Sequence, residues 1–287
     1  MSNEIDVAKV KEAIKNIQKK YGRDSIYLLG DNKEKGSLAR WSTGFDDFDS
    51  MINGGMPKSR IIEISGIEGA GKTSVALAFA GKVKLAAFID AEGTLDDDRA
   101  NILGVPKGKL IIERPESGEE ICETIVSFVK TNIPLVIIDS VPSIVPHDFL
   151  DKIAKDGYDV NNMAGTARLL SQKLFPTLIP ALKHSQSTVI FINQIRDKIG
   201  VIFGETTFTP GGHALKHYAA LRIYVARRQW FGSKENRIGQ LCSFKIVKSK
   251  VSMPYRECEL CLHFTKGFIT HDEMKKDLKE QKREESK

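Results

Sequence analysis

The sequence predicts an α/β protein with a mostly parallel central sheet, helices flanking that sheet, an antiparallel extension and an N-terminal helix. Three observations support this fold class. Short apolar runs alternate with helical stretches from Arg60 to about residue 193, as in a parallel sheet covered by helices. Further strand-like runs follow residue 220 without long helices between them. The start of the chain has an amphipathic helical pattern of its own.

Residues 1–22 are predicted to form a helix, with Gly22 as a stop signal. Apolar residues recur there at alternating spacings of three and four, which makes one stripe. They are Val7, Val10, Ile14, Ile17 and Tyr21. A helix must bury such a stripe, and packing on its own chain and packing on a neighbouring subunit are equally compatible with the pattern.

The predicted core begins at Arg60 and contains five short apolar runs, which are typical of strands buried on both faces of a parallel sheet. They are RIIEIS (60–65), KLAAFID (84–90), KLIIE (109–113), PLVIID (134–139) and STVIFIN (187–193). Helices are predicted between them at about 72–82, 117–130 and 163–184. Strand-like runs at 221–227, 241–248 and 256–264 are expected to extend the sheet antiparallel.

Two intervals have no clear assignment, about 147–162 and 195–212. The second is long, glycine-rich and polar, yet it contains apolar residues such as Ile199. Long loops inside compact domains are usually functional or disordered. The tail from His271 carries six basic and six acidic residues and is interpreted as a frayed helix or a disordered end.

Composition indicates an ordinary globular chain of 287 residues, 41% hydrophobic and 28% charged. No apolar run is long enough for a membrane span, the N-terminus has no signal-peptide segment, and four scattered cysteines favour a reducing cytosol. The net charge is +6, but Lys216–Lys250 alone holds nine Lys or Arg against the single acid Glu235. This basic segment is either a solvated face or a surface for a polyanion such as nucleic acid.

A phosphate-binding loop is predicted at GIEGAGKT, Gly66 to Thr73. It matches G-x-x-x-x-G-K-[ST] and lies between a predicted strand and a predicted helix, which is the context that supports the motif. Glycines let backbone N–H groups converge on phosphate oxygens at a helix N-terminus. Lys72 is expected to reach the β- and γ-phosphates, and the Thr73 hydroxyl to hold Mg²⁺.

Three further predicted strands end in polar residues at the same sheet edge. Asp139 ends LVIID and is expected to support Mg²⁺. FIDAEG provides Asp90, interpreted as structural, and Glu92, the candidate base that orients a hydrolytic water. Gln194 in FINQIR could contact the γ-phosphate and pass nucleotide state to the loop after it, or could be an ordinary polar loop residue.

Together these motifs resemble the RecA family, over almost the whole chain up to about residue 268. The resemblance is carried by STGFDDFDSMINGGMPKSRIIEISGIEGAGKT, AAFIDAEGTLD, VIIDSVPSIVP, FINQIRDKIGVIFGE, TPGGHALKHYA and FKIVKSKV. It implies a RecA-type P-loop ATPase core at 33–270, an N-terminal polymerisation helix and linker at 1–32, and a charged tail at 271–287. The implied protein is a DNA-dependent ATPase that forms a filament on single-stranded DNA, binds double-stranded DNA secondarily, and catalyses homologous pairing and strand exchange in the cytoplasm.

The resemblance also assigns residues. Glu92, Lys72 and Gln194 take the catalytic roles, with Glu92 as the hydrolytic glutamate and Gln194 as the γ-phosphate sensor. Contacts to ATP and Mg²⁺ fall on Gly66, Glu68, Gly69, Ala70, Gly71, Lys72, Thr73, Ser74, Asp96, Arg99, Asp139, Lys248 and Lys250, the last two reaching the nucleotide of the neighbouring subunit. Two DNA-binding loops are implied at about 147–163 and 195–212. DNA contacts fall on Met163, Arg168, Ser171, Gln172, Arg196, Lys198, Ile199, Gly200, Gly211, Gly212 and His213.

Physical chemistry is consistent with these DNA assignments, since amides and basic side chains hold phosphates without reading sequence and an apolar wedge such as Ile199 can separate stacked bases. Arg227, Arg228 and Lys245 could serve the secondary duplex site or form a solvated strand face. Cys258, Cys261 and His263 suggest zinc, but they lie in a predicted strand without a second ligand pair. We therefore do not expect a metal site there.

The chain departs from the family in three ways. Arg99 stands where the family has an adenine-stacking tyrosine; arginine can also stack on a base. The first DNA-binding loop is about four residues longer than is typical. The chain ends at residue 287, before most of the family's C-terminal domain, which keeps open a second hypothesis, an accessory filament protein that regulates or caps a full-length recombinase.

Overall fold

A computed structural model describes the chain except for residues 1–4, 24, 29–37, 157–161, 198–206 and 286–287. The chain divides into two units, Met1–Ala39 and Arg40–Lys287. The boundary between them lies at residue 39, a few residues beyond the predicted end of the linker. None of the helices in the described residues is both long and apolar enough to cross a membrane.

The first unit contains the predicted N-terminal helix, α1 (Val7–Tyr21). The Asp6 side chain caps it by accepting hydrogen bonds from the amides of Ala8 and Lys9, and Gly22, at a φ of +96°, ends it. No residue of α1 is buried. The apolar stripe is therefore not covered by its own unit, and Val7 and Tyr21 are more than half exposed, at 60% and 66%.

The second unit is built on a nine-stranded sheet with the order β13-β12-β11-β10-β3-β7-β6-β4-β5. The predicted strands of the parallel half are β3 (Arg60–Gly66), β4 (Ala86–Asp90), β5 (Leu110–Glu113), β6 (Leu135–Asp139) and β7 (Thr188–Gln194). The extension consists of β10 (Leu221–Gly232), β11 (Arg237–Ser249), β12 (Glu257–His263) and β13 (Gly267–Ile269). The pairings of β11 with β10 and with β12 are antiparallel as predicted, and β13, which was not predicted, adds to β12 antiparallel; β10 joins β3 in parallel.

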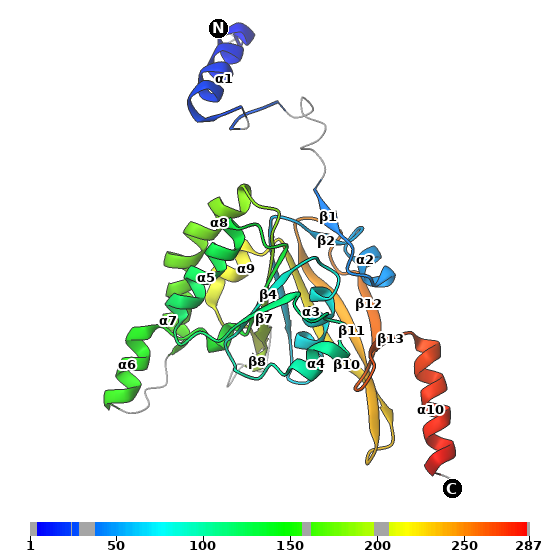
Figure 1. The fold of residues 1–287 in the computed structure, drawn as a ribbon. Helices are drawn as coiled ribbons and strands as arrows, with labels where there is room; N and C mark the ends of the chain where they lie inside the picture. Colours follow the sequence, from blue (N-terminus) through cyan, green and yellow to red (C-terminus); the bar gives the residue numbers. More distant parts are fainter. Residues whose placement is uncertain (1–4, 24, 29–37, 157–161, 198–206, 286–287) are drawn as a thin grey trace. The chain divides into compact units, whose positions relative to one another are not determined.

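Helices cover both faces of this sheet (Figure 1). One face packs against α2 (Asp46–Met51), α3 (Lys72–Ala80) and α4 (Asp97–Ile102). The other packs against α5 (Gly118–Lys130), α7 (Asn162–Leu169), the π-helical turn Leu170–Leu174, α8 (Phe175–Lys183) and α9 (Gly212–Tyr218). The remaining elements are β1 (Arg40–Trp41), β2 (Met56–Pro57), the 3-10 turn Val141–Ser143, α6 (His147–Asp156), β8 (Arg196–Asp197), β9 (Thr207–Phe208) and α10 (His271–Glu285).

Two sequence-based expectations were wrong. The prediction that all five parallel strands are buried on both faces fails for β5, where Ile111 and Ile112 are 36% and 40% exposed, because β5 is the edge strand. The interpretation of the tail as frayed or disordered fails because α10 packs on the sheet: Met274 is 1% exposed and contacts the cluster of Phe231, Leu241 and Cys261.

The two unassigned intervals are partly structured. The first contains α6 and the start of α7, and the second contains the antiparallel pair β8 and β9 before α9. The predicted DNA contacts Lys198, Ile199 and Gly200 lie outside the described residues. Met163 lies in α7, but its side chain is also outside the described part of the chain.

Candidate functional site: a nucleotide pocket at the end of β3

The phosphate-binding loop connects β3 to α3. Gly71 caps α3 at a φ of +97°, a conformation that side chains rarely adopt. Gly66 ends β3 where an added Cβ would lie 2.2 Å from the Val225 carbonyl oxygen of β10. Position 71 therefore needs glycine for its backbone conformation, and position 66 needs it for close packing against β10. Together they let the loop turn tightly with its amides at the start of α3.

Lys72 supplies a buried positive charge to this loop. Its side chain is 8% exposed, and its Nζ donates to the Ile67 carbonyl oxygen at 2.7 Å. Burial lowers the pKa of Lys72, whereas the carboxylates of Asp139, Glu92 and Glu68 raise it. A cation held in low dielectric next to an open loop of amides is suited to binding phosphate.

Asp139 and Thr73 are brought together as the sequence predicts. The Thr73 hydroxyl donates to Asp139 Oδ2 at 2.5 Å. Burial raises the pKa of Asp139 to about 6; the Thr73 hydrogen bond and Lys72 lower it, and the charges of Glu92 and Asp90 raise it. A desolvated carboxylate beside a hydroxyl is a hard-oxygen donor set, and this fits Mg²⁺ bound with nucleotide phosphates.

Glu92 lies just beyond β4, within reach of two neighbouring strand ends. Its Oε1 accepts hydrogen bonds from the Ser140 hydroxyl and, at 3.3 Å, from Gln194 Nε2. Glu92 and Gln194 thus meet, although 102 residues separate them. Ser140 was not identified from the sequence, and its position directly after Asp139 is the signal that could have found it.

Asp90 has a structural role, as predicted. Its carboxylate accepts from the amides of Thr94 and Leu95 at 3.0 Å each, and from Arg114 Nε at 3.3 Å. These bonds hold the turn that follows β4. The turn leads to Asp96, which caps α4 by accepting from the Arg99 amide at 3.3 Å.

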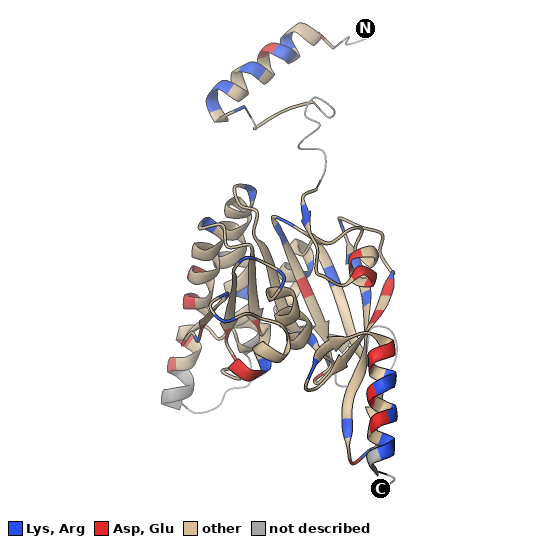
Figure 2. Cartoon of the chain, turned by 45° about the vertical axis from the view of Figure 1, so that its right-hand side comes forward, with Lys and Arg blue, Asp and Glu red and all other residues tan. Residues whose placement is uncertain are grey.

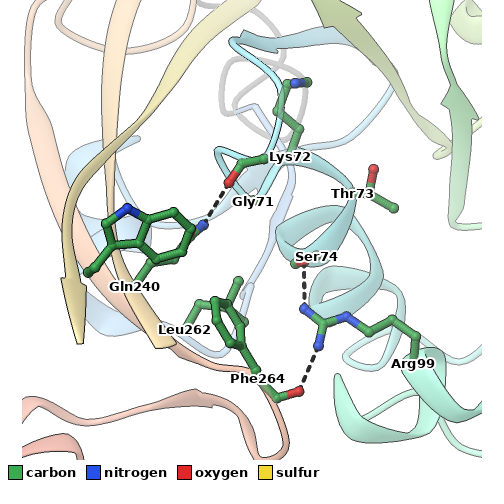
Figure 3. A pocket seen from close by; sticks show the side chains of 10 residues that line it. Gly71, Lys72, Thr73, Ser74, Arg99, Gln240, Leu262 and Phe264 are labelled. Atoms are coloured by element: carbon green, nitrogen blue, oxygen red, sulfur yellow. Dashed lines mark hydrogen bonds between the residues drawn. The ribbon is translucent and has the colours of Figure 1, made fainter. Parts of the chain in front are cut away.

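A cavity of about 340 Å³ opens beside the loop (Figure 3). It is lined by Gly69, Gly71, Lys72, Thr73, Ser74, Arg99, Trp230, Gln240, Leu262 and Phe264. The Arg99 guanidinium spans it, with Nη2 donating to Ser74 Oγ at 3.1 Å and Nη1 to the Phe264 carbonyl oxygen at 2.8 Å. Burial lowers the pKa of Arg99. The guanidinium is thus held across the cavity by protein acceptors, rather than free to stack.

Sequence reasoning missed the wall opposite Arg99. Trp230 lies between Arg227 and Arg237, each guanidinium carbon 4.1 Å from its ring centroid. Gln240 Nε2 donates to the Gly69 carbonyl oxygen at 3.1 Å, and Arg227 Nη1 to the same oxygen at 3.4 Å. These residues come from β10 and β11, whose register no local motif predicts.

The predicted neighbour-subunit lysines do not line this cavity. Lys248 and Lys250 lie at the C-terminal end of β11. Through the register of β10, this end is aligned with the first half of β3 and not with Gly66, where the phosphate-binding loop begins. The Nζ of Lys250 donates to the His217 carbonyl oxygen at 2.8 Å, and Lys248 Nζ donates to the carbonyl oxygens of Lys216 and His217. Both lysines therefore bind the last turn of α9 within the chain.

Most of the predicted DNA contacts that the structure describes are at the surface. Arg168, Ser171, Gln172, Arg196 and His213 are exposed, whereas Gly211 is buried. Of the elements that carry them, α7 and α9 are in contact. Gly212 allows the two elements to approach, because a Cβ added there would lie 2.8 Å from Ala167 Cβ. Arg196 follows Gln194 by two residues in the chain.

The basic segment Lys216–Lys250 divides into separate environments. Figure 2 shows Lys and Arg at several separate places along the ribbon. Arg227 lies beside the phosphate-binding loop. Arg228 faces Glu257 and Glu259 at 3.9 and 3.8 Å, and Lys245 is exposed on β11. Among the residues that the structure describes, Cys258, Cys261 and His263 do not form part of any metal-ligand cluster of three or more.

Comparisons with known proteins agree with this geometry. The chain matches the RecA N-terminal domain family over residues 8–269. It is 39% identical over 264 residues to Protein RecA of Mycoplasma mobile, covering 90% of this chain and 78% of that protein. It is 38% identical over 267 residues to Protein RecA of Staphylococcus aureus strain JH9, covering 91% and 75%.

Proposed function

This chain belongs to the RecA family, and from that premise we propose that it is a DNA-dependent ATPase that forms a filament on single-stranded DNA and catalyses homologous pairing and strand exchange. The observation that carries the proposal is the meeting of Glu92 with Gln194 beside the Thr73–Asp139 pair. A site for binding alone needs no carboxylate held next to the phosphates; a hydrolytic site does.

In this proposal, the loop amides and Lys72 bind the β- and γ-phosphates, and Thr73 and Asp139 hold Mg²⁺. Held there, Mg²⁺ would supply positive charge against the negative charge that develops on the phosphates. Glu92 orients the attacking water and accepts its proton. Arg99, Ser74 and the Trp230–Phe264 wall enclose the base end of ATP.

Gln194 links this chemistry to DNA. It donates to Glu92 and stands at the end of β7, two residues before Arg196. When ATP is bound, its amide can turn to the γ-phosphate, which would change the path of the segment that follows. The exposed groups of α7 and α9, with Arg196, would then hold the phosphates of single-stranded DNA. Double-stranded DNA would bind secondarily, near Lys245.

Filament formation is proposed from two features. The exposed stripe of α1 requires a partner, and a neighbouring copy would provide one. Lys248 and Lys250 lie away from their own phosphate-binding loop and would approach the nucleotide of a neighbour. The nucleotide would then bind between subunits.

The test combines two assays of purified protein. ATP hydrolysis is measured with and without single-stranded DNA, and strand exchange is measured with homologous duplex, ATP and Mg²⁺. We expect DNA to stimulate hydrolysis and exchange to require ATP. Stimulated hydrolysis without exchange would reject the recombinase and favour the accessory filament protein. Hydrolysis at the same rate with and without single-stranded DNA would reject both the recombinase and the accessory filament protein.

A further inference from the structure

One hairpin and one turn of the antiparallel extension line the end of the cavity that is proposed to hold the base. The hairpin of β10 and β11 contributes Trp230 and Gln240, and the turn between β12 and β13 contributes Phe264. The rings of Trp230 and Phe264 meet edge to face, with centroids 6.2 Å apart. The hairpin is joined to the phosphate-binding loop by Gln240 Nε2, which donates to the Gly69 carbonyl oxygen at 3.1 Å, and the β12–β13 turn is joined to Arg99 through the Phe264 carbonyl oxygen.

The C-terminal helix α10 contacts the β12–β13 turn through Asp277. The two oxygens of this carboxylate each accept from Lys266 Nζ at 2.8 Å, and its side chain is 12% exposed. His263 Nε2 lies 3.6 Å from Asp277 Oδ2, and His263 Nδ1 accepts from the Thr265 amide at 3.2 Å. Phe264 is therefore flanked in the chain by residues that Asp277 holds.

The same helix contacts the β10–β11 hairpin. Gln281 Nε2 donates to the Asn236 carbonyl oxygen in the hairpin turn at 2.7 Å. Met274 packs against Phe231 and Leu241, one from each strand of the hairpin. The helix runs beside the extension, in contact with β10 and β12 (Figures 1 and 2). It thus bridges the two loops that carry Trp230 and Phe264.

We propose that Asp277 is a positioning residue for the nucleotide pocket: by holding the β12–β13 turn to α10, it keeps the Phe264 carbonyl oxygen in place to accept from Arg99 and keeps the Phe264 ring at the base end of the cavity. This inference rests on the proposed function only in that the cavity binds a nucleotide. Asp277 touches no nucleotide itself. Its effect falls on binding, because the base end does not take part in the hydrolytic step.

The physical reason lies in the order of contacts. Arg99 joins the turn to Ser74 on α3 through two hydrogen bonds. Those bonds need the turn to stay within about 0.5 Å of its position. The turn is short, and in the described part of the chain Lys266 and His263 both contact α10 at the Asp277 carboxylate. Removing that carboxylate releases Lys266 and His263 together, so the cavity wall becomes mobile and nucleotide binding must order it again.

The test uses the full chain carrying Asp277→Asn, which keeps the shape of the side chain and removes its charge. ATP–Mg²⁺ binding is measured by calorimetry, and KM and kcat for ATP by steady-state hydrolysis with saturating single-stranded DNA. We expect Kd and KM to rise by roughly three- to tenfold, and kcat to stay within about twofold. Asp277→Glu should recover most of the affinity. The matched control is Asp272→Asn, because Asp272 is on the same helix but 95% exposed.

Lys266→Gln tests the same contact from the turn, where the lysine side chain is 54% exposed and its loss leaves the core intact. The double variant should bind ATP no more weakly than whichever single variant binds it more weakly, because both substitutions break the same Lys266–Asp277 ion pair. Full additivity, or an unchanged Kd in Asp277→Asn, would overturn the inference. A parent chain that binds no ATP would instead reject the proposed function.

Discussion

Replacing Glu92 by glutamine is the sharpest test of the proposed chemistry. Glutamine keeps the shape and one carbonyl oxygen, so Ser140 and Gln194 keep an acceptor. It removes the base. General acid–base groups contribute about 10²–10⁴-fold to rate, which corresponds to about 2.7–5.4 kcal/mol of activation free energy. We expect kcat for ATP hydrolysis to fall within this range.

Binding should respond in the opposite direction. The Glu92 charge raises the pKa of both Lys72 and Asp139, so it reaches the phosphate end of the cavity. Its removal takes away repulsion between a carboxylate and the nucleotide phosphates, and the Kd for ATP should stay the same or decrease.

The assay pairs steady-state hydrolysis with calorimetric binding of ATP–Mg²⁺. Glu280→Gln, an exposed change on α10, is the control for the loss of one negative charge. A Glu92→Gln variant whose kcat stays within about threefold of the parent would refute the role of Glu92 as base. Lost binding together with lost hydrolysis would show a structural role instead.

Three further predictions follow from the packing. Lys72→Ala should weaken ATP binding by at least about tenfold, since it removes the buried positive charge that is proposed to contact the phosphates. Calorimetry measures this change, and unchanged affinity would reject the site. Gly212→Ala should destabilise the fold by roughly 1–3 kcal/mol in chemical denaturation, because the added Cβ would lie 2.8 Å from Ala167 Cβ at a residue with φ +68°. Gly108→Ala, at φ +78° with open space around the added Cβ, should cost less. Equal costs would contradict the proposed clash. Burial raises the pKa of Glu113, so the contribution of this side chain to stability is greatest below the ordinary carboxyl pKa and is lost as pH rises through the folded-state pKa. Glu113→Gln should therefore raise Tm at pH 7 relative to the parent but not at pH 4. Equal shifts of Tm at the two pH values would contradict this.

Local sequence was enough for the phosphate end of the site. The loop at Gly66–Thr73 is one strand, one glycine turn and one helix start, and each is specified by neighbouring residues. The carboxyl ends of parallel strands meet at one edge of a sheet, so the sequence alone could predict that Asp139, Glu92 and Gln194 lie at that edge. Their hydrogen-bond partner Ser140 needed the structure.

The C-terminal tail shows where local pattern failed. Its high and balanced charge indicated a frayed helix or a disordered end, yet Met274 and Leu278, four residues apart, form an apolar contact with the sheet. Two residues are too few to reveal a helix stripe by periodicity. The edge position of β5 could not be predicted either, because the composition of a strand does not determine its place in the strand order of the sheet.

The sequence by itself determined the fold class, the phosphate-binding loop and the family resemblance, because these depend on short-range patterns and motif spacing. The base end of the cavity was decided only by tertiary structure. Arg99, Trp230 and Phe264 come from three distant segments, and they meet because β10 lies against β3 and the antiparallel strands follow in a particular register. That register is set by packing over the whole sheet, so no local pattern reveals which side chains line the cavity.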